Sequence, residues 1–261
     1  MKYAKSISIL FALLIFGYSA VSAQNFKEFD KTFPIEKNGR VSVDTYKGEI
    51  RVETWDKPEV HVYAKMVPDD NGGWFSTSPK KQLERVRIEY DNSPGEVRIK
   101  SDYKKSDSFF GSNTMALVYY EIKMPKTADL RIEDYKSESK IGGLQSSLKL
   151  NTYKGEVKIN GHSGPIDLET YKGEVTVKLL KLSDDCRFDT YKGEIRITVP
   201  RDAAFTADFD LGKKVSLDTS FGLENESNRR KHDGYDFRKD VNGGGPYVKI
   251  SSYKGDIRLF D

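Results

Sequence analysis

Thr152-Tyr153-Lys154-Gly155-Glu156-Val157 is one copy of a six-residue stretch that this 261-residue chain repeats. The other copies, three close and two looser, span Thr45–Ile50, Thr170–Val175, Thr190–Ile195, Asp134–Ser139 and Ser252–Ile257. Six of the 15 tyrosines occur in this one context. Self-similarity of this kind indicates that the fold is built from a repeated structural unit.

The residues on both sides of each copy alternate between apolar and polar side chains. Leu148 and Leu150 precede Thr152, and Val157 and Ile159 follow the glycine. This period of two is typical of a half-buried strand, so the unit is a strand, a Tyr-Lys-Gly corner and a second strand. Glycine suits such a corner because it adopts positive φ without a Cβ clash. The predicted turn glycines are Gly48, Gly155, Gly173, Gly193 and Gly255.

The spacing of the copies predicts the class of fold. Tyr135, Tyr153, Tyr171 and Tyr191 follow one another at intervals of 18, 18 and 20 residues. We therefore expect an all-β, elongated, β-helix-like solenoid with about 18–20 residues per turn, in which each turn buries its aliphatic side chains against its neighbours. An antiparallel β-sandwich of hairpins is the alternative. Parallel stacking in register would distinguish the two, because it places the motif lysines in one row about 4.8 Å apart.

Three regions follow from this pattern. Residues 1–23 have a basic start, an apolar run and a small-residue end at Val21-Ser22-Ala23, which predicts a signal peptide. Residues 24–133 read as a less regular β region continuous with the repeats, and residues 134–261 as the regular repeats with a polar loop at 224–246. We expect an exported protein, in the periplasm, on the outer surface or secreted, with no transmembrane span after cleavage.

Charge and cysteine content exclude some functional classes. The 43 basic and 40 acidic residues nearly cancel, whereas a nucleic-acid-binding protein concentrates basic charge, so we expect no nucleic-acid partner. Cys186 is the only cysteine, so the chain has no internal disulfide. Its strand parity with Phe188 predicts a buried, unreactive thiol.

The repeated corners supply the candidate binding residues. A row of tyrosines with flanking lysines is able to contact sugar rings through aromatic faces and to hold acidic glycans. The alternative is that tyrosine covers the corner and lysine only shields the surface. We predict that the tyrosines form one aligned row. The candidate contact residues are Tyr46, Lys47, Tyr135, Tyr153, Lys154, Tyr171, Lys172, Tyr191, Lys192, Tyr253 and Lys254.

No catalytic, cofactor or metal site is predicted. The three histidines, His61, His162 and His232, lack metal-ligand spacing. The acidic residue that follows each motif glycine recurs once per unit, whereas catalytic groups are singular and lie in a cleft. We therefore expect no enzyme, with a polysaccharide-active enzyme as the remote alternative.

The pairs Trp74-Phe75 and Phe109-Phe110 indicate loops that either cap the sheet ends or contact a partner.

These features resemble a known family. The signal peptide, the repeated strand–Gly-[Glu/Asp]-[Ile/Val] units and the Pro-x-x-Ala corners at Pro125–Ala128 and Pro200–Ala203 are similar to those of the putative adhesin domain family of exported bacterial β-strand-repeat proteins, most of them of unknown function. The resemblance covers most of the chain after residue 23, best over residues 116–200 and 247–259. It implies an elongated solenoid-like fold and transfers no catalytic residue.

The predicted function combines these points. We expect an exported, non-enzymatic β-repeat scaffold that acts as an adhesin-like interaction protein in the periplasm or at the surface. Its partner would be a protein or glycan of the cell envelope, and no cofactor is expected. The alternative is a carbohydrate-binding module that uses the Tyr-Lys corners.

Overall fold

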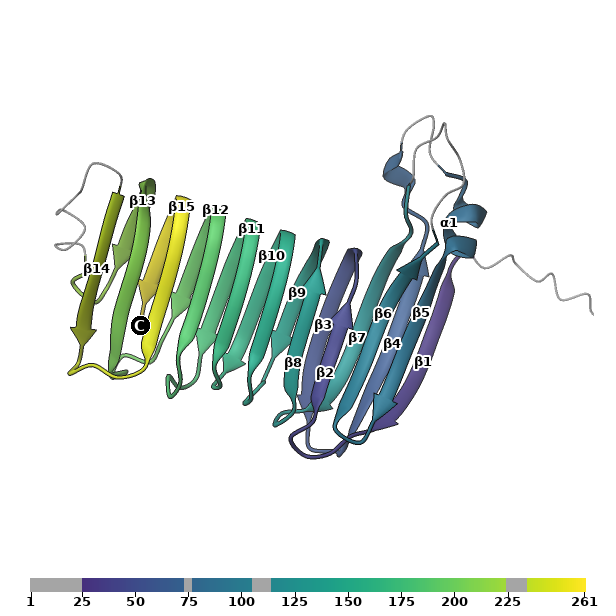
Figure 1. Ribbon diagram of the computed structural model, residues 1–261, viewed down its shortest axis with the longest axis horizontal. Helices are drawn as coiled ribbons and strands as arrows, with labels where there is room; N and C mark the ends of the chain where they lie inside the picture. The colour runs from purple at the N-terminus through teal and green to yellow at the C-terminus, as the bar shows by residue number, and fades with distance from the viewer. Residues whose placement is uncertain (1–24, 73–76, 105–113, 224–233) are drawn as a thin grey trace, which may run out of the picture.

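The protein is an elongated rod of strands that lie across its long axis (Figure 1). The structure, a computed structural model, describes residues 25–72, 77–104, 114–223 and 234–261. The predicted signal peptide and the pairs Trp74-Phe75 and Phe109-Phe110 lie outside the described residues.

Strands account for most of the described chain. The first nine are β1 (Lys27–Pro34), β2 (Arg40–Asp44), β3 (Lys47–Trp55), β4 (Glu59–Val67), β5 (Val86–Ser93), β6 (Glu96–Tyr103), β7 (Leu117–Pro125), β8 (Asp129–Asp134) and β9 (Lys136–Gly142). The remaining six are β10 (Leu148–His162), β11 (Ile166–Leu179), β12 (Cys186–Thr198), β13 (Phe205–Thr219), β14 (Gly234–Val241) and β15 (Tyr247–Phe260). A short helix α1 (Pro79–Arg85) and a 3₁₀ turn η1 (Asp70–Gly72) lie at the end of the rod that holds β1 and β5.

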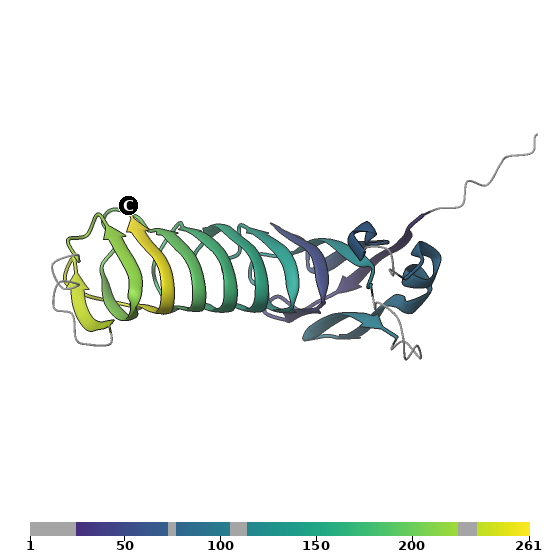
Figure 2. The same cartoon turned by 90° about the horizontal axis from the view of Figure 1, so that it is seen from above.

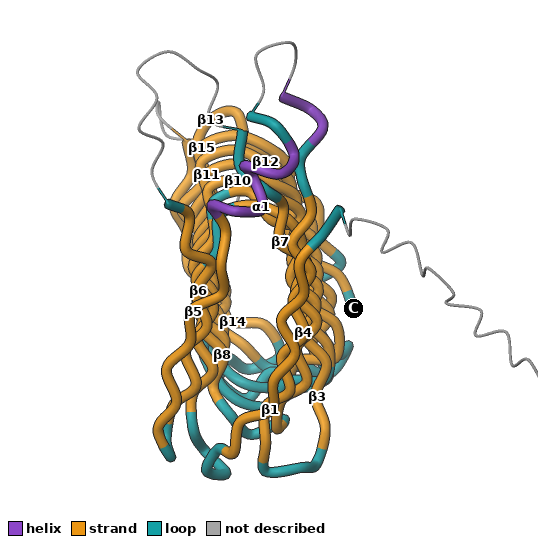
Figure 3. The backbone as a smooth tube through the Cα atoms, turned by 90° about the vertical axis from the view of Figure 1, so that its right-hand side faces the viewer, coloured by secondary structure: helices purple, strands orange, loops and turns teal. Residues whose placement is uncertain are grey.

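The long strands confirm the solenoid prediction. β10, β11, β12 and β15 each bend at the Tyr-Lys-Gly corner, so that one half lies in each of two facing walls (Figure 3). They pair in parallel and in register, with Lys154 beside Lys172 and Lys172 beside Lys192. Successive turns coil along the rod (Figure 2). Parallel pairing excludes the sandwich of antiparallel hairpins.

The order of turns along the rod differs from their order in the chain. β2 and β3 lie between the β6–β7 turn and the β8–β9 turn, with parallel pairing on both sides. At the other end β15, the last strand of the chain, lies between β12 and β13 (Figure 1). The sequence repeats did not predict this interleaving.

Antiparallel strands complete both ends of the rod. β1 pairs with β4 and β5 pairs with β6 at one end, and β14 pairs with β13 at the other. The outermost strands carry many charges, such as Lys27, Glu28 and Asp30 in β1 and Arg238 and Lys239 in β14. Charged edge strands resist pairing with further chains, so the ends of the rod are not built for head-to-tail growth.

The core fills the space between the two walls. Each turn contributes inward-facing aliphatic residues, and in β10 Leu148, Leu150, Val157 and Ile159 are all buried. At about 1.5–3 kcal/mol for each buried side chain, one turn gains about 6–12 kcal/mol from its core residues. Cys186 is buried as predicted, and burial raises the pKa of its thiol to about 12, which keeps it unreactive.

The prediction of a polar loop at 224–246 is wrong for part of this range. Residues 234–241 form β14, which pairs antiparallel with β13. Phe237 packs on Phe209 with the ring centroids 5.3 Å apart. The segment reads as polar because it is an edge strand with one face in solvent.

Candidate functional site

The six motif tyrosines form one continuous row, as predicted. Consecutive ring centroids are 4.8 Å apart from Tyr46 to Tyr135, Tyr153 and Tyr171, then 4.9 Å to Tyr191 and 5.0 Å to Tyr253. The angles between neighbouring ring planes range from 14° down to 1°, so all the rings are stacked. We call this set the tyrosine row. In-register strand pairing produces it, because each strand places its ring beside the next.

Stacking decides which part of each tyrosine is available to a ligand. Each inner ring lies between two neighbouring rings, so its faces are covered. Tyr135 is half-buried, whereas the other five members are exposed, from 37% for Tyr46 to 54% for Tyr253, and this exposure belongs to the ring edges and hydroxyl groups. The prediction that sugar rings contact the aromatic faces is therefore wrong for the inner tyrosines. Contact through the hydroxyl groups is the mode that the geometry allows.

A lysine follows each tyrosine and forms a second row. In spatial order its members are Lys47, Lys136, Lys154, Lys172, Lys192, Lys254 and Lys214. Lys214 comes from β13 and lies outside the six sequence motifs, so strand register was needed to find it. The first two members have local partners: Lys47 forms an ion pair with Asp69, and the Lys136 ammonium lies 5.7 Å from the Tyr135 ring centroid.

The motif glycines allow neighbouring corners to approach closely. A Cβ added to Gly155, Gly173 or Gly193 would lie 1.8–2.0 Å from a carbonyl oxygen of the adjacent strand. Gly48 and Gly255 are equally crowded and have φ of 142° and 134°. The predicted positive φ is present at Gly48, Gly155, Gly193 and Gly255 but not at Gly173, where the close backbone approach is the reason for glycine.

One looser copy replaces this glycine with Ser137. There Asp134 accepts hydrogen bonds from the Ser137 N–H at 2.7 Å and the Ser137 hydroxyl at 2.6 Å. The Thr152 hydroxyl donates to the same carboxylate at 2.8 Å. Burial raises the pKa of the Asp134 carboxyl despite these bonds. The serine and aspartate together form a local turn in place of glycine.

An open groove of about 820 Å³ runs beside the tyrosine row. Tyr153, Tyr171, Tyr191 and Tyr253 line one side of it. Acidic and hydroxyl residues from the first halves of the strands line the rest, including Glu133, Glu169, Asp189, Asp210, Thr170, Thr190 and Ser252. Within the described chain, the hydroxyls of Thr170, Thr190 and Ser252 are buried without a hydrogen-bond partner.

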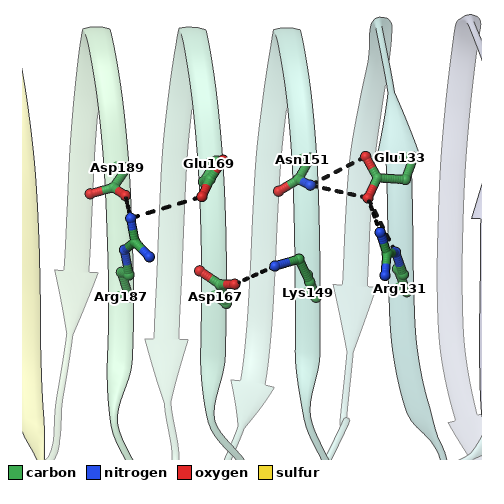
Figure 4. Close-up of polar contacts among 8 residues, drawn as sticks. All are labelled: Arg131, Glu133, Lys149, Asn151, Asp167, Glu169, Arg187 and Asp189. Carbon is green, nitrogen blue, oxygen red and sulfur yellow. Dashed lines mark hydrogen bonds and ion pairs between the residues drawn. The ribbon is translucent and has the colours of Figure 1, made fainter.

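The charges on this wall largely neutralise one another. Figure 4 shows Arg131 paired with Glu133 at 2.9 Å and Lys149 paired with Asp167 at 2.7 Å. Arg187 forms an ion pair with Asp189 and lies 3.9 Å from Glu169 (Figure 4). Exposed pairs of this kind contribute at most about 1 kcal/mol each, and their main effect is to leave the wall with little net charge.

His162 is the last residue of β10. It is fully buried, and neither imidazole nitrogen forms a hydrogen bond within the described part of the chain. Burial lowers the pKa of His162, although the Gly164 and Pro165 backbone nearby opposes the shift. A buried neutral imidazole has no link to the tyrosine or lysine rows, so we assign it a structural role.

His162 should make stability depend on pH. In the unfolded chain its pKa is about 6.5, so below this pH the unfolded state binds a proton that the folded state does not. Wild-type stability should therefore fall as the pH drops below about 6.5, by at most about 1.4 kcal/mol per pH unit from this residue. Urea unfolding of the wild type and of His162→Leu at pH 8, 6 and 5 measures the effect. The variant should lose less stability on acidification; equal losses would contradict the assignment.

The described residues contain neither a metal-binding cluster nor a membrane-spanning helix. Across residues 25–72, 77–104, 114–223 and 234–261, no three His, Cys, Asp or Glu side chains gather to hold a metal ion. His61 instead lies 2.8 Å from Asp30, and His232 falls outside these ranges. The same ranges contain no helix with the length and apolar character needed to cross a membrane.

Comparison with known proteins places the chain by family. No curated protein sequence matches it. A crystal structure of a "putative cell adhesion protein" from Clostridium sporogenes ATCC 15579 is similar, with a TM-score of 0.47, 10% identity, and coverage of 90% of this chain and 99% of that one. A "putative adhesin" from Bacteroides fragilis NCTC 9343 has a TM-score of 0.31, 8% identity and coverage of 90% and 97%. Another from Parabacteroides distasonis ATCC 8503 has a TM-score of 0.24, 12% identity and coverage of 89% and 97%.

The family assignment depends on the sequence model rather than on these structures. The family model described as Toastrack DUF4097 matches residues 27–259, which is nearly the whole described chain. This match agrees with the adhesin-like β-repeat family that the corner motifs resemble. Because the family model covers nearly the whole described chain, the chain belongs to the Toastrack DUF4097 family.

Proposed function

We propose that this protein is an exported, non-enzymatic binding scaffold that holds an extended partner along its row of corners. The observation that carries the proposal is the uninterrupted row of six stacked tyrosines, five of them exposed and Tyr135 half-buried, on a parallel stack of strands. Each of the six motif copies presents a tyrosine and a lysine at the same position, so the surface has a linear repeat. A partner with a repeat of its own, such as a glycan of the cell envelope, is able to make the same contact many times.

The repetition argues against catalysis at these corners. An active site needs a small number of side chains with distinct roles, held in a water-excluding pocket. Here six turns carry the same tyrosine and lysine, and the adjoining groove is open to solvent. Weak contacts that are repeated give avidity rather than chemistry.

The hydroxyl groups of the tyrosine row should make the key contacts, since the ring faces are covered. Tyr153, Tyr171 and Tyr191 replaced together by phenylalanine should keep the stack and lose the hydrogen bonds. Each lost bond costs about 0.5–1.5 kcal/mol, so glycan binding should weaken at least about tenfold while stability changes little. Binding is measured on an array of neutral and acidic linear glycans, followed by calorimetry with the glycans that bind.

The matched control is the double substitution Tyr90→Phe and Tyr119→Phe. Both tyrosines are exposed but lie away from the row. The control should bind like the wild type. The proposal fails if no glycan binds the wild type, or if the row variant and the control bind equally well.

A further inference from the structure

Five lysines at the corner form an exposed ridge along the rod. The lysine ridge consists of Lys154, Lys172, Lys192, Lys254 and Lys214, contributed by β10, β11, β12, β15 and β13. All five are exposed. Strand spacing places successive members about 4.8 Å apart, so the ridge extends over about 19 Å. The glycine column lies next to it and leaves the backbone uncovered by side chains.

The acidic row across the glycine column neutralises the lysine ridge only in part. Two of its carboxylates, those of Glu156 and Glu194, form ion pairs with bases on the wall. Glu156 pairs with Lys158 at 2.6 Å, and Lys158 also lies within electrostatic reach of Glu174. Glu194 pairs with Arg258 at 3.0 Å. One hollow is lined by Lys154, Lys172 and Lys192 and by the carboxylates of Glu156, Glu174, Glu194 and Asp256, so the acidic row offsets part of the charge of the ridge.

The corner keeps an excess of positive charge, because the five lysines of the ridge, together with Lys158 and Arg258 on the wall, outnumber the four carboxylates. Within the described residues, none of its five lysines forms an ion pair, whereas the wall in Figure 4 pairs its charges across strands. Like charges on adjacent strands repel, and their spacing is shorter than the screening length of about 8 Å at physiological salt. An arrangement that costs stability at every turn is expected where an anion supplies the missing charge.

The spacing of the ridge selects among anionic polymers. An extended acidic peptide carries one charge for about every 3.3 Å of its length, which is denser than one lysine per strand. One strand of duplex DNA carries one phosphate for about every 3.4 Å of helix axis, which is also denser. A pyranose residue in a linear glycan is similar in length to the distance between strands. One carboxylate per sugar residue would therefore meet one lysine per strand.

We infer that the lysine ridge binds a linear anionic polysaccharide that carries one carboxylate on each sugar residue, with the glycan chain parallel to the rod axis. This inference rests on the proposed function and specifies its ligand class. The carboxylates contact the lysine ammoniums, and the sugar hydroxyls reach the phenol hydroxyls of the neighbouring tyrosine row. Affinity should rise with glycan length until the chain spans all five lysines.

Oligogalacturonates of one to eight residues are the probe, with their methyl esters as the uncharged match. The wild type should bind the acid form at least tenfold more tightly than the ester. Lys154→Gln, Lys172→Gln and Lys192→Gln together should weaken acid-form binding at least tenfold. This variant should also lower the dependence of affinity on salt, because fewer counterions are exchanged. Calorimetry at 50 and 200 mM salt measures both effects.

The control variant carries Lys100→Gln, Lys123→Gln and Lys178→Gln, which remove the same charge from exposed positions on the walls. It should bind like the wild type. Equal loss in both variants, or equal binding of polyglutamate, would overturn the inference by showing a response to net charge alone. Binding of a neutral glycan that depends on the tyrosine hydroxyls but not on the ridge would preserve the proposed function and overturn this ligand class.

Discussion

Replacing Gly255 by alanine is expected to destabilise the protein by about 3–5 kcal/mol, through backbone strain and overpacking together. The added Cβ would lie 1.8 Å from the carbonyl oxygen of Gly193, and the residue has φ of 134°. That oxygen belongs to the backbone of β12, so no side chain is able to move aside. Relief requires β12 and β15 to separate, which breaks the hydrogen-bond ladder on both sides of the corner.

Gly95→Ala is the matched control. No atom lies within 4 Å of its added Cβ, and Gly95 does not have positive φ. At such a position alanine is neutral or stabilises by about 0.4–1 kcal/mol through the unfolded state. Urea unfolding followed by circular dichroism compares the two variants with the wild type. If Gly255→Ala and Gly95→Ala unfold at similar urea concentrations, the corner tolerates a side chain and the prediction is wrong.

Deleting residues 247–261 is expected to prevent the last turns from folding. It removes Val248, Ile250, Ile257 and Leu259, which are at most 1% exposed. At about 1.5–3 kcal/mol each, their burial contributes about 6–12 kcal/mol, similar to the whole stability of an ordinary domain. It also leaves β12 and β13 without their common neighbour, so β13 and β14 should detach.

Limited proteolysis with mass spectrometry measures this effect. Cleavage should concentrate between residues 199 and 241 in the truncated chain, and a synthetic peptide of residues 247–261 added in solution should restore protection. Removal of Asp261 alone is the control, because this terminal residue is exposed and contributes only surface contacts. A truncated protein that resists protease as well as the wild type would mean that β13 pairs directly with β12.

The repeated motif was enough to predict the class of fold and the composition of the row. The alternation around Tyr153 identified which residues are buried, and the spacing of the copies identified parallel turns. The motif did not predict the order of the turns along the rod. Thr45–Ile50 and Ser252–Ile257 have nearly the same sequence as the other copies, so the motif is compatible with any position in the stack. Register also brings in Lys214, which no motif contains.

Three features could not be predicted from the sequence, each for its own physical reason. Whether the tyrosines present faces or edges depends on the distance between strands, which composition does not express. The sequence did not reveal β14, because an edge strand needs apolar side chains on one face only, and Phe237 supplies much of that face. Ser137 lacks the motif glycine, and only the hydrogen bonds to Asp134 reveal how the corner is kept.

The place of β15 between β12 and β13 also sets a time order for folding. Residues 247–261 follow β13 and β14 in the chain, yet they fill the slot between β12 and β13. The C-terminal turns therefore cannot assemble progressively as the chain emerges, in contrast to a solenoid whose turns follow chain order. Pairing across such sequence distances is slow, so β13 should complete its pairing only after residues 247–260 have been made.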